Sequence, residues 1–180
     1  MSTTVIEREL YRERYTMELV RRAQINDRVD AQVTLVTLFA GVVSYYILNF
    51  PTCSWNCLFW IFLGTFTVLC IGTILAMISV GLAVLTDKTA YLPSPNVFNI
   101  YVKDLVKACL LADPTNGKAI AEQTLIAQLD GDHLLLADAN AQRNDFRDGC
   151  LRWSKRFVLI ALLGFLATAI PHMQLSTSGS

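Results

Sequence analysis

The sequence predicts an all-α integral membrane protein with about three transmembrane helices, an N-terminal amphipathic helix and a small helical cytoplasmic region. Two observations lead to this fold class. Hydrophobic residues make up 53% of the 180-residue chain, and no Asp, Glu, Lys or Arg occurs at residues 33–86 or after Arg156. A helix in water keeps a polar face. Long blocks without charge therefore indicate that lipid surrounds them.

Residues 1–30 are predicted to be cytoplasmic and to form an amphipathic helix. Its apolar positions fall on one side: Ile6, Leu10, Met17 and Val20. Glu18 and Arg22 have the one-turn spacing of an ion pair. The segment holds six Arg and six acidic residues without the apolar core of a signal peptide, so the first span is expected to remain in the protein. Either this helix is solvated, or it lies on the membrane surface or against a neighbouring subunit.

A transmembrane hairpin is predicted for residues 31–86, with spans at about 31–50 and 55–86. The first span makes ~30 Å of helix, which matches the hydrocarbon thickness, and Pro51 ends it. The second makes ~48 Å, so we expect its cytoplasmic end to leave the lipid and pack on protein. Four aromatic side chains are expected in an interfacial belt: Tyr45, Tyr46, Trp55 and Trp60.

The cytoplasmic region is predicted at residues 87–156. We expect it to hold a helix at residues 96–111 with Asn96 as a possible N-cap, a turn at 113–117, a short helix at 118–130 and a break at 130–132. From Asp132 the chain can run as one helix into a third span at residues 157–173, followed by a tail at 174–180. The alternative for this span is a hydrophobic helix buried against the excess length of the second.

The loop charges predict the orientation. Six Arg precede the first span, nine basic residues lie in residues 87–156, and neither the short loop nor the C-terminal tail carries a charge. The positive-inside rule then places the N-terminus and residues 87–156 in the cytoplasm, and the short loop and the C-terminus outside.

Small and hydroxylated residues recur along the spans. Thr34, Thr37, Gly41 and Ser44 share one face of the first span, and Gly72 and Ala76 have the small-x-x-x-small spacing in the second. Two interpretations are open. These residues pack helices inside one subunit, or they form a subunit contact or the wall of a narrow pore. The hydroxyls could equally bond their own backbone carbonyls.

The polar segment at residues 138–156 leads directly into the third span. Arg152, Lys155 and Arg156 are expected to form a basic band at anionic lipid head groups. The helix is either a solvated stalk that ends in this band or a link that couples a cytoplasmic event to the membrane.

No catalytic, cofactor-binding or metal site is predicted, and neither is nucleic-acid binding. The sequence lacks a nucleophile elbow, a phosphate-binding loop and a His-Glu-x-x-His motif. His133 follows Asp130 and Asp132, but no further ligands converge on it in sequence. Cys53 and Cys57 are spaced either for a local disulfide or simply to fill lipid-facing volume.

The order of these elements resembles the SLATT-type and related small membrane effectors of bacterial antiphage systems. Residues 21–31 (RRAQINDRVDA) and 141–147 (AQRNDFR) carry the resemblance, and the third span is an addition to a two-span pattern. The resemblance implies an oligomeric effector of the bacterial inner membrane. Such an effector forms a pore or disrupts the membrane after a signal from a cytoplasmic sensor protein or a nucleotide. The alternative is a non-pore scaffold that anchors a soluble partner through residues 96–150.

Overall fold

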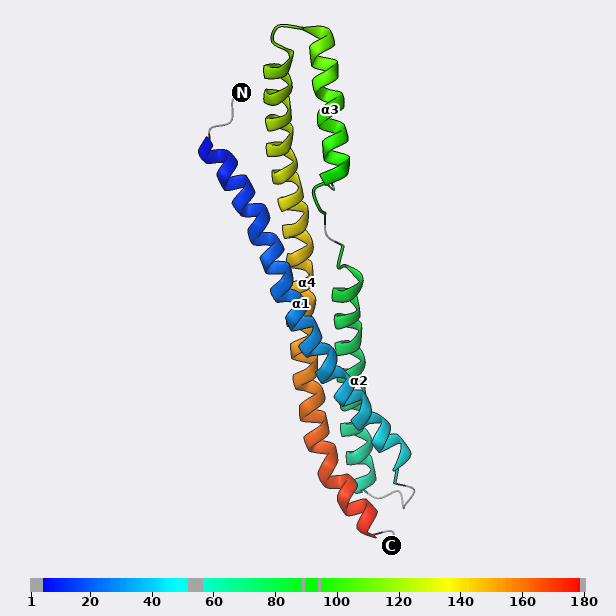
Figure 1. Ribbon diagram of the computed structural model, residues 1–180. Coiled ribbons are helices and arrows are strands. Elements are labelled where there is room, and N and C mark those ends of the chain that lie inside the picture. Colours follow the sequence, from blue (N-terminus) through cyan, green and yellow to red (C-terminus); the bar gives the residue numbers. More distant parts are fainter. Residues whose placement is uncertain (1–4, 52–56, 89, 94, 179–180) are drawn as a thin grey trace. The chain divides into compact units, whose positions relative to one another are not determined.

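Four helices make up most of the part of the chain that the structure describes. This computed structural model describes residues 5–51, 57–88, 90–93 and 95–178, among which there is no strand. The helices are α1 (Val5–Leu48), α2 (Cys57–Leu85), α3 (Pro95–Ala112) and α4 (Gly117–Ser178) (Figure 1). By length and composition, α1, α2 and α4 could each cross a membrane. The all-α prediction and the number of candidate spans are therefore confirmed.

α1 joins the predicted amphipathic helix and the predicted first span without a break. It ends at Leu48, shortly before Pro51, as expected from the restriction that proline places on the residue before it. α2 covers the predicted second span almost end to end. Trp55 and Cys53 lie outside the described residues. Of these helices, α1 carries both the charged N-terminal segment and the apolar segment that follows it.

The prediction of Asn96 as an N-cap is wrong, because α3 already begins at Pro95. Proline fits the first helical position, where its missing N–H would have had no partner within the helix. The turn predicted at residues 113–117 is confirmed. Asp113 Oδ1 accepts hydrogen bonds from the backbone N–H groups of Thr115 and Asn116 at 2.9 and 3.0 Å.

The predicted break at residues 130–132 is also wrong, because α4 runs uninterrupted from Gly117 to Ser178. A glycine inside a helix costs only about 1 kcal/mol relative to alanine, and the buried Ala121 and Ala137 on either side of Gly131 contribute packing that offsets it. The helix also continues through Pro171, so residues 174–178 are helical rather than a tail. Leu175, 2% exposed, packs in an apolar cluster beyond that proline.

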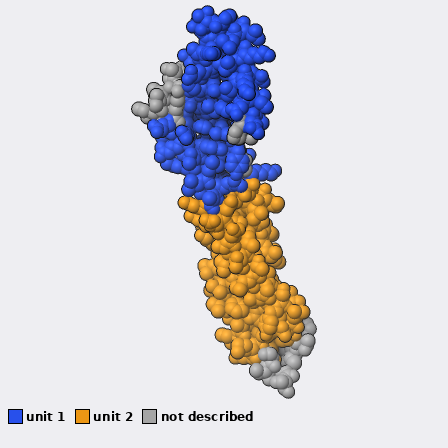
Figure 2. Space-filling view, viewed as in Figure 1, with its two compact units in different colours: residues 1–23, 88–144 blue, residues 24–87, 145–180 orange. Residues whose placement is uncertain are grey.

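The chain divides into two compact units (Figure 2). Unit 1 comprises Met1–Ala23 and Lys88–Asn144, and unit 2 comprises Gln24–Asp87 and Asp145–Ser180. In unit 1, the Tyr15 ring stacks on His133 with centroids 5.6 Å apart, and Arg14 pairs with Asp138 at 2.9 Å. These contacts hold the start of α1 against the first half of α4.

In unit 2, the parts of α1, α2 and α4 pack against one another through three buried clusters. One of them joins Ala83, near the end of α2, to Ile25, Val29 and Leu151. One side of the last turns of α2 therefore packs on protein, whereas Val84 and Leu85 at the same end are exposed. Tyr46 is 4% exposed and lies in another cluster, so its placement in an interfacial belt is wrong. Because its ring contacts Phe62 and His172, it is a core residue.

Candidate functional site

The hydroxyl face predicted on the first span lies exposed on α1. Thr34, Thr37, Gly41 and Ser44 are all exposed, and a Cβ added at Gly41 would meet nothing within 4 Å. Each hydroxyl donates to the carbonyl one turn earlier: Thr34 to Asp30 at 3.0 Å, Thr37 to Val33 at 2.8 Å and Ser44 to Ala40 at 2.9 Å. These hydroxyls are thus satisfied by their own helix, and the face needs no water.

Gly72 and Ala76 lie in a different environment, in the buried interface between α2 and α4. Ala76 is 1% exposed, and a Cβ on Gly72 would lie 2.8 Å from the Ala161 backbone nitrogen. On α4, a Cβ on Gly164 would lie 2.7 Å from the Leu69 nitrogen. The two backbones approach closely because these glycines lack a side chain. For this pair the interpretation as packing inside one subunit is favoured, whereas the α1 face remains available to a partner.

The predicted basic band is exposed on α4. Arg152, Lys155 and Arg156 are exposed, and the Arg156 guanidinium lies 4.7 Å from the centroid of the Trp153 ring. Trp153 is itself 54% exposed. A tryptophan among cations is the combination found at the level of lipid head groups. The role of the band at the membrane stays a prediction.

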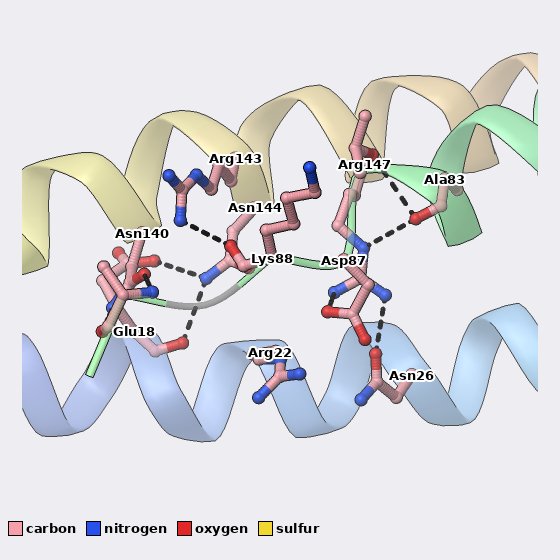
Figure 3. A network of polar contacts seen from close by, with 12 residues as sticks. Glu18, Arg22, Asn26, Ala83, Asp87, Lys88, Asn140, Arg143, Asn144 and Arg147 are labelled. Carbon is pink, nitrogen blue, oxygen red and sulfur yellow. Dashed lines mark hydrogen bonds and ion pairs between the residues drawn. The ribbon is translucent and has the colours of Figure 1, made fainter. Parts of the chain in front are cut away.

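A buried arginine in unit 2 joins all three of its helices. Arg147 on α4 is 2% exposed. Its Nε donates to the Ala83 carbonyl at 3.0 Å, and its terminal nitrogens reach Asp87 at 2.8 Å and Asn26 at 2.6 Å (Figure 3). The charge therefore caps the last turn of α2, where helix carbonyls lack partners within the helix. Arg147 ties the end of α2 to both neighbouring helices.

Two buried asparagines in unit 1 hold other segments against α4. The Asn140 amide accepts from the Ala90 N–H at 3.0 Å and donates to the Ala90 carbonyl at 3.1 Å. Asn144 donates to both the carbonyl and the carboxylate of Glu18 at 3.0 Å. Arg143 donates to the Lys88 carbonyl at 2.6 Å (Figure 3). The chain between α2 and α3 is thereby fastened to α4 by paired hydrogen bonds.

The prediction of a solvated stalk at residues 138–156 is wrong for one face of the helix. Asn140, Asn144 and Arg147 are each at most 3% exposed, and Ser154 is fully buried. The sequence did not reveal this buried face, because polar residues normally indicate a solvent-exposed side of a helix. The spacing of Asn140, Arg143, Asn144 and Arg147 at i, i+3, i+4 and i+7 was the available signal, since it places all four on one side of a helix.

The structure also places the remaining polar candidates, His133 and two of the cysteines. Among the described residues, no three or more His, Cys, Asp and Glu side chains gather into a set that could hold a metal ion. His133 is stacked on Tyr15. Cys57 has a free, exposed thiol. Burial raises the pKa of the Cys150 thiol above its ordinary value, so this thiol is a poorer nucleophile than a solvated one.

The chain matches no protein-family model, no curated protein and no solved structure. The SLATT-type resemblance therefore stays a prediction, and the function must be argued from the residues themselves.

Proposed function

We propose that the chain is a multi-pass protein of the bacterial inner membrane, with its N-terminus in the cytoplasm. In this proposal the apolar part of α1, most of α2 and the last part of α4 cross the bilayer. The lengths and compositions of these three helices support it. So does the distribution of cations, all of which lie before residue 33 or within residues 87–156.

The observation that carries this proposal is the large amount of apolar surface that unit 2 exposes. Its exposed side chains include many large apolar groups, among them Leu38 at 62%, Leu163 at 58% and Ile170 at 64%. Its interior contains Thr73, Thr168 and other polar residues at 9% exposure or less. A water-soluble fold of this size does not expose contiguous apolar surface on every helix. Lipid is the solvent that accommodates this surface.

We further propose that the chain associates with copies of itself and permeabilises or disrupts the membrane after a cytoplasmic signal, as a defence against phage. Self-association is supported by the α1 face of Thr34, Thr37, Gly41 and Ser44, because these small residues are exposed while Gly72 and Gly164 are used in packing within the chain. The defence role rests on the resemblance of residues 21–31 and 141–147. No Asp, Glu, Lys, Arg or His lies within residues 33–86, so an ion-coupled transporter is not proposed.

Two measurements test the proposal in cells. Fractionation should recover the protein in membranes, resistant to carbonate extraction and released by detergent. Induction during phage infection, or at high copy number, should collapse the signal of a potential-sensitive dye and arrest growth. Recovery as a monodisperse species without detergent would contradict membrane insertion. An unchanged potential with normal growth under both conditions would contradict the effector role alone.

A membrane scaffold is the second candidate, and one specific observation favours it. α3 in unit 1 exposes large apolar side chains outside the proposed spans: Val97 at 58%, Ile100 at 63% and Leu111 at 79%. Exposed apolar groups on one short helix are typical of a docking surface. A stoichiometric soluble partner, retained by the solubilised wild-type protein and lost with Ile100→Asp, would favour this function.

A further inference from the structure

One face of α3 in unit 1 combines apolar side chains with two cations. It forms a shallow groove of about 460 Å³ lined by Val102, Lys103, Val106, Lys107, Leu110 and Leu111. Both lysines are exposed, and they lie four residues apart, so their charges project one helical turn apart. Asp104 is also exposed on α3 but does not line this groove. We call the six lining residues the α3 face.

A second groove in unit 1 has the opposite charge. It lies between α1 and α4 and has a volume of about 810 Å³. Glu9, Glu13 and Asp130 line it, together with one arginine, Arg12, and the ring of His133. The three carboxylates and one guanidinium give a formal charge of −2. Ile126 and Leu129 add an apolar part. We call this surface the acidic groove.

The two surfaces match in charge, spacing and length. Glu9 and Glu13 are four residues apart on α1, as Lys103 and Lys107 are on α3, so each pair spans about 6 Å along its helix. The α3 face extends over ~14 Å of helix and the acidic groove over ~11 Å. Each surface also offers aliphatic side chains beside its charges. One surface could therefore bury its apolar groups against the other while its charges pair.

We propose that the α3 face of one copy docks in the acidic groove of a second copy. This inference rests on the self-association in the proposed function and names the contact in unit 1 that would drive it. An anionic lipid surface would attract Lys103 and Lys107 but would repel Glu9 and Glu13. A second copy satisfies both surfaces at once. Because the two surfaces differ, the contact is heterologous, and repeating it builds either a ring or an open chain of subunits.

Charge reversal on the full-length, detergent-solubilised protein tests this contact. The variants are Lys103→Glu with Lys107→Glu, Glu9→Lys with Glu13→Lys, and the quadruple variant that combines them. Lys118→Glu, at an exposed position outside both surfaces, is the control. Particle mass is measured against protein concentration. Each double variant should raise the midpoint concentration for assembly at least tenfold, because like charges then face each other. The quadruple variant should return to within about threefold of the wild type.

Recovery in the quadruple variant separates a contact from simple misfolding, since a misfolded double variant would not be repaired by two further reversals. Raising the salt concentration from 0.1 to 0.5 M should weaken wild-type assembly, because salt screens the exposed charges of the two surfaces. If the double variants assemble like the wild type, or if the quadruple variant stays dissociated, the inference is overturned while membrane permeabilisation can still stand. A wild type that is monomeric at every concentration overturns both the contact and self-association.

Discussion

Arg147 and Asp87 form an ion pair of 2.8 Å in which the arginine side chain is only 3% exposed and the aspartate is 30% exposed. The pair closes the end of α2 against α4, and Asn26 of α1 accepts from the same guanidinium. A buried charge is tolerated only when its partners replace the lost water. Any motion that separates α2 from α4 at this end must break the contacts of this arginine.

Replacing Arg147 should therefore destabilise the protein strongly. In Arg147→Met, the oxygens of Asn26, Ala83 and Asp87 lose a shared donor inside the protein, so we expect the free energy of unfolding to fall by about 2–4 kcal/mol. Arg147→Lys should recover little of this stability, because the lysine ammonium cannot reproduce the planar arrangement of donors in the guanidinium. Unfolding in mixed detergent micelles measures the loss.

The control for Arg147→Met is Arg152→Met on the same helix. Arg152 is 70% exposed and lies 3.8 Å from the Asp148 carboxylate. Exposed pairs contribute at most about 1 kcal/mol. A loss in Arg147→Met no larger than in this control would contradict the capping role of Arg147.

The close approach of α2 and α4 predicts a second difference between matched positions. Gly72→Ala should lower the free energy of unfolding by about 1–3 kcal/mol, because the new methyl group would lie 2.8 Å from the Ala161 nitrogen. Gly64→Ala, two turns earlier on the same helix, has nothing within 4 Å and should be neutral or stabilising by up to about 1 kcal/mol. Equal effects at the two sites would argue against a close approach of the two helices at Gly72.

The sequence predicted the helices around Arg147 and Gly72, but it did not predict the partners of these two residues. The charge-free blocks at residues 33–86 and after Arg156 predicted the apolar helices, because lipid permits few alternatives to a helix. The small-residue spacing predicted for Gly72 and Ala76 either packing inside one subunit or a subunit contact or pore wall. It could not say which helix they meet, because that contact depends on the register between α2 and α4. For the same reason, the sequence did not distinguish the small residues of the α1 face, which are exposed, from Gly72 and Ala76 of α2, which are buried.

Local signals misled where tertiary contacts override them. Gly131 between two aspartates is typical of a turn, yet α4 continues through it, because one glycine inside a long helix costs only about 1 kcal/mol. A solvated stalk at residues 138–156 would place Arg147 in water, because an arginine is seldom buried. Its partners Asn26 and Asp87 lie about 120 and 60 residues away in sequence, so no local pattern could pair them.

The turn before α4 predicts a dependence of stability on pH. Hydrogen bonds from the backbone N–H groups of Asn116 and Thr115 hold the pKa of Asp113 below its ordinary value. Since the folded pKa is depressed, the ionised carboxylate stabilises the fold above the ordinary pKa of the unfolded chain. That contribution is lost as the pH falls through the folded value. The stability difference between wild type and Asp113→Ala should therefore shrink between pH 6 and pH 3.

Helix unfolding followed by circular dichroism at each pH measures this difference. Asp104→Ala, at an exposed position of α3, controls for the loss of one negative charge. A difference between wild type and Asp113→Ala that stays constant down to pH 3 would show that the carboxylate charge does not stabilise the turn.

The proposed orientation can be tested with cysteine labelling of intact cells. Cys57 is exposed at the start of α2, on the side assigned to the exterior, and Cys109 lies on α3, on the side assigned to the cytoplasm. In variants that retain only one cysteine, a membrane-impermeant maleimide should label Cys57 in intact cells and Cys109 only after lysis. Labelling of Cys109 alone before lysis would show that the orientation is opposite to the proposed one.

The exposed α1 face predicts the outcome of adding bulk to it. Thr37→Leu with Gly41→Leu should leave the fold intact, because both positions are exposed and Gly41 has open space around it. If this face joins subunits or lines a pore, the double variant should lose at least tenfold in dye depolarisation and in toxicity. Gly64→Leu with Thr67→Leu is a matched control on α2. It changes the same two residue types at exposed positions, and Thr67 makes the same hydrogen bond to the preceding turn. Full toxicity in the α1 variant would exclude both roles for this face, whereas equal losses in both variants would indicate a general effect of bulk on insertion.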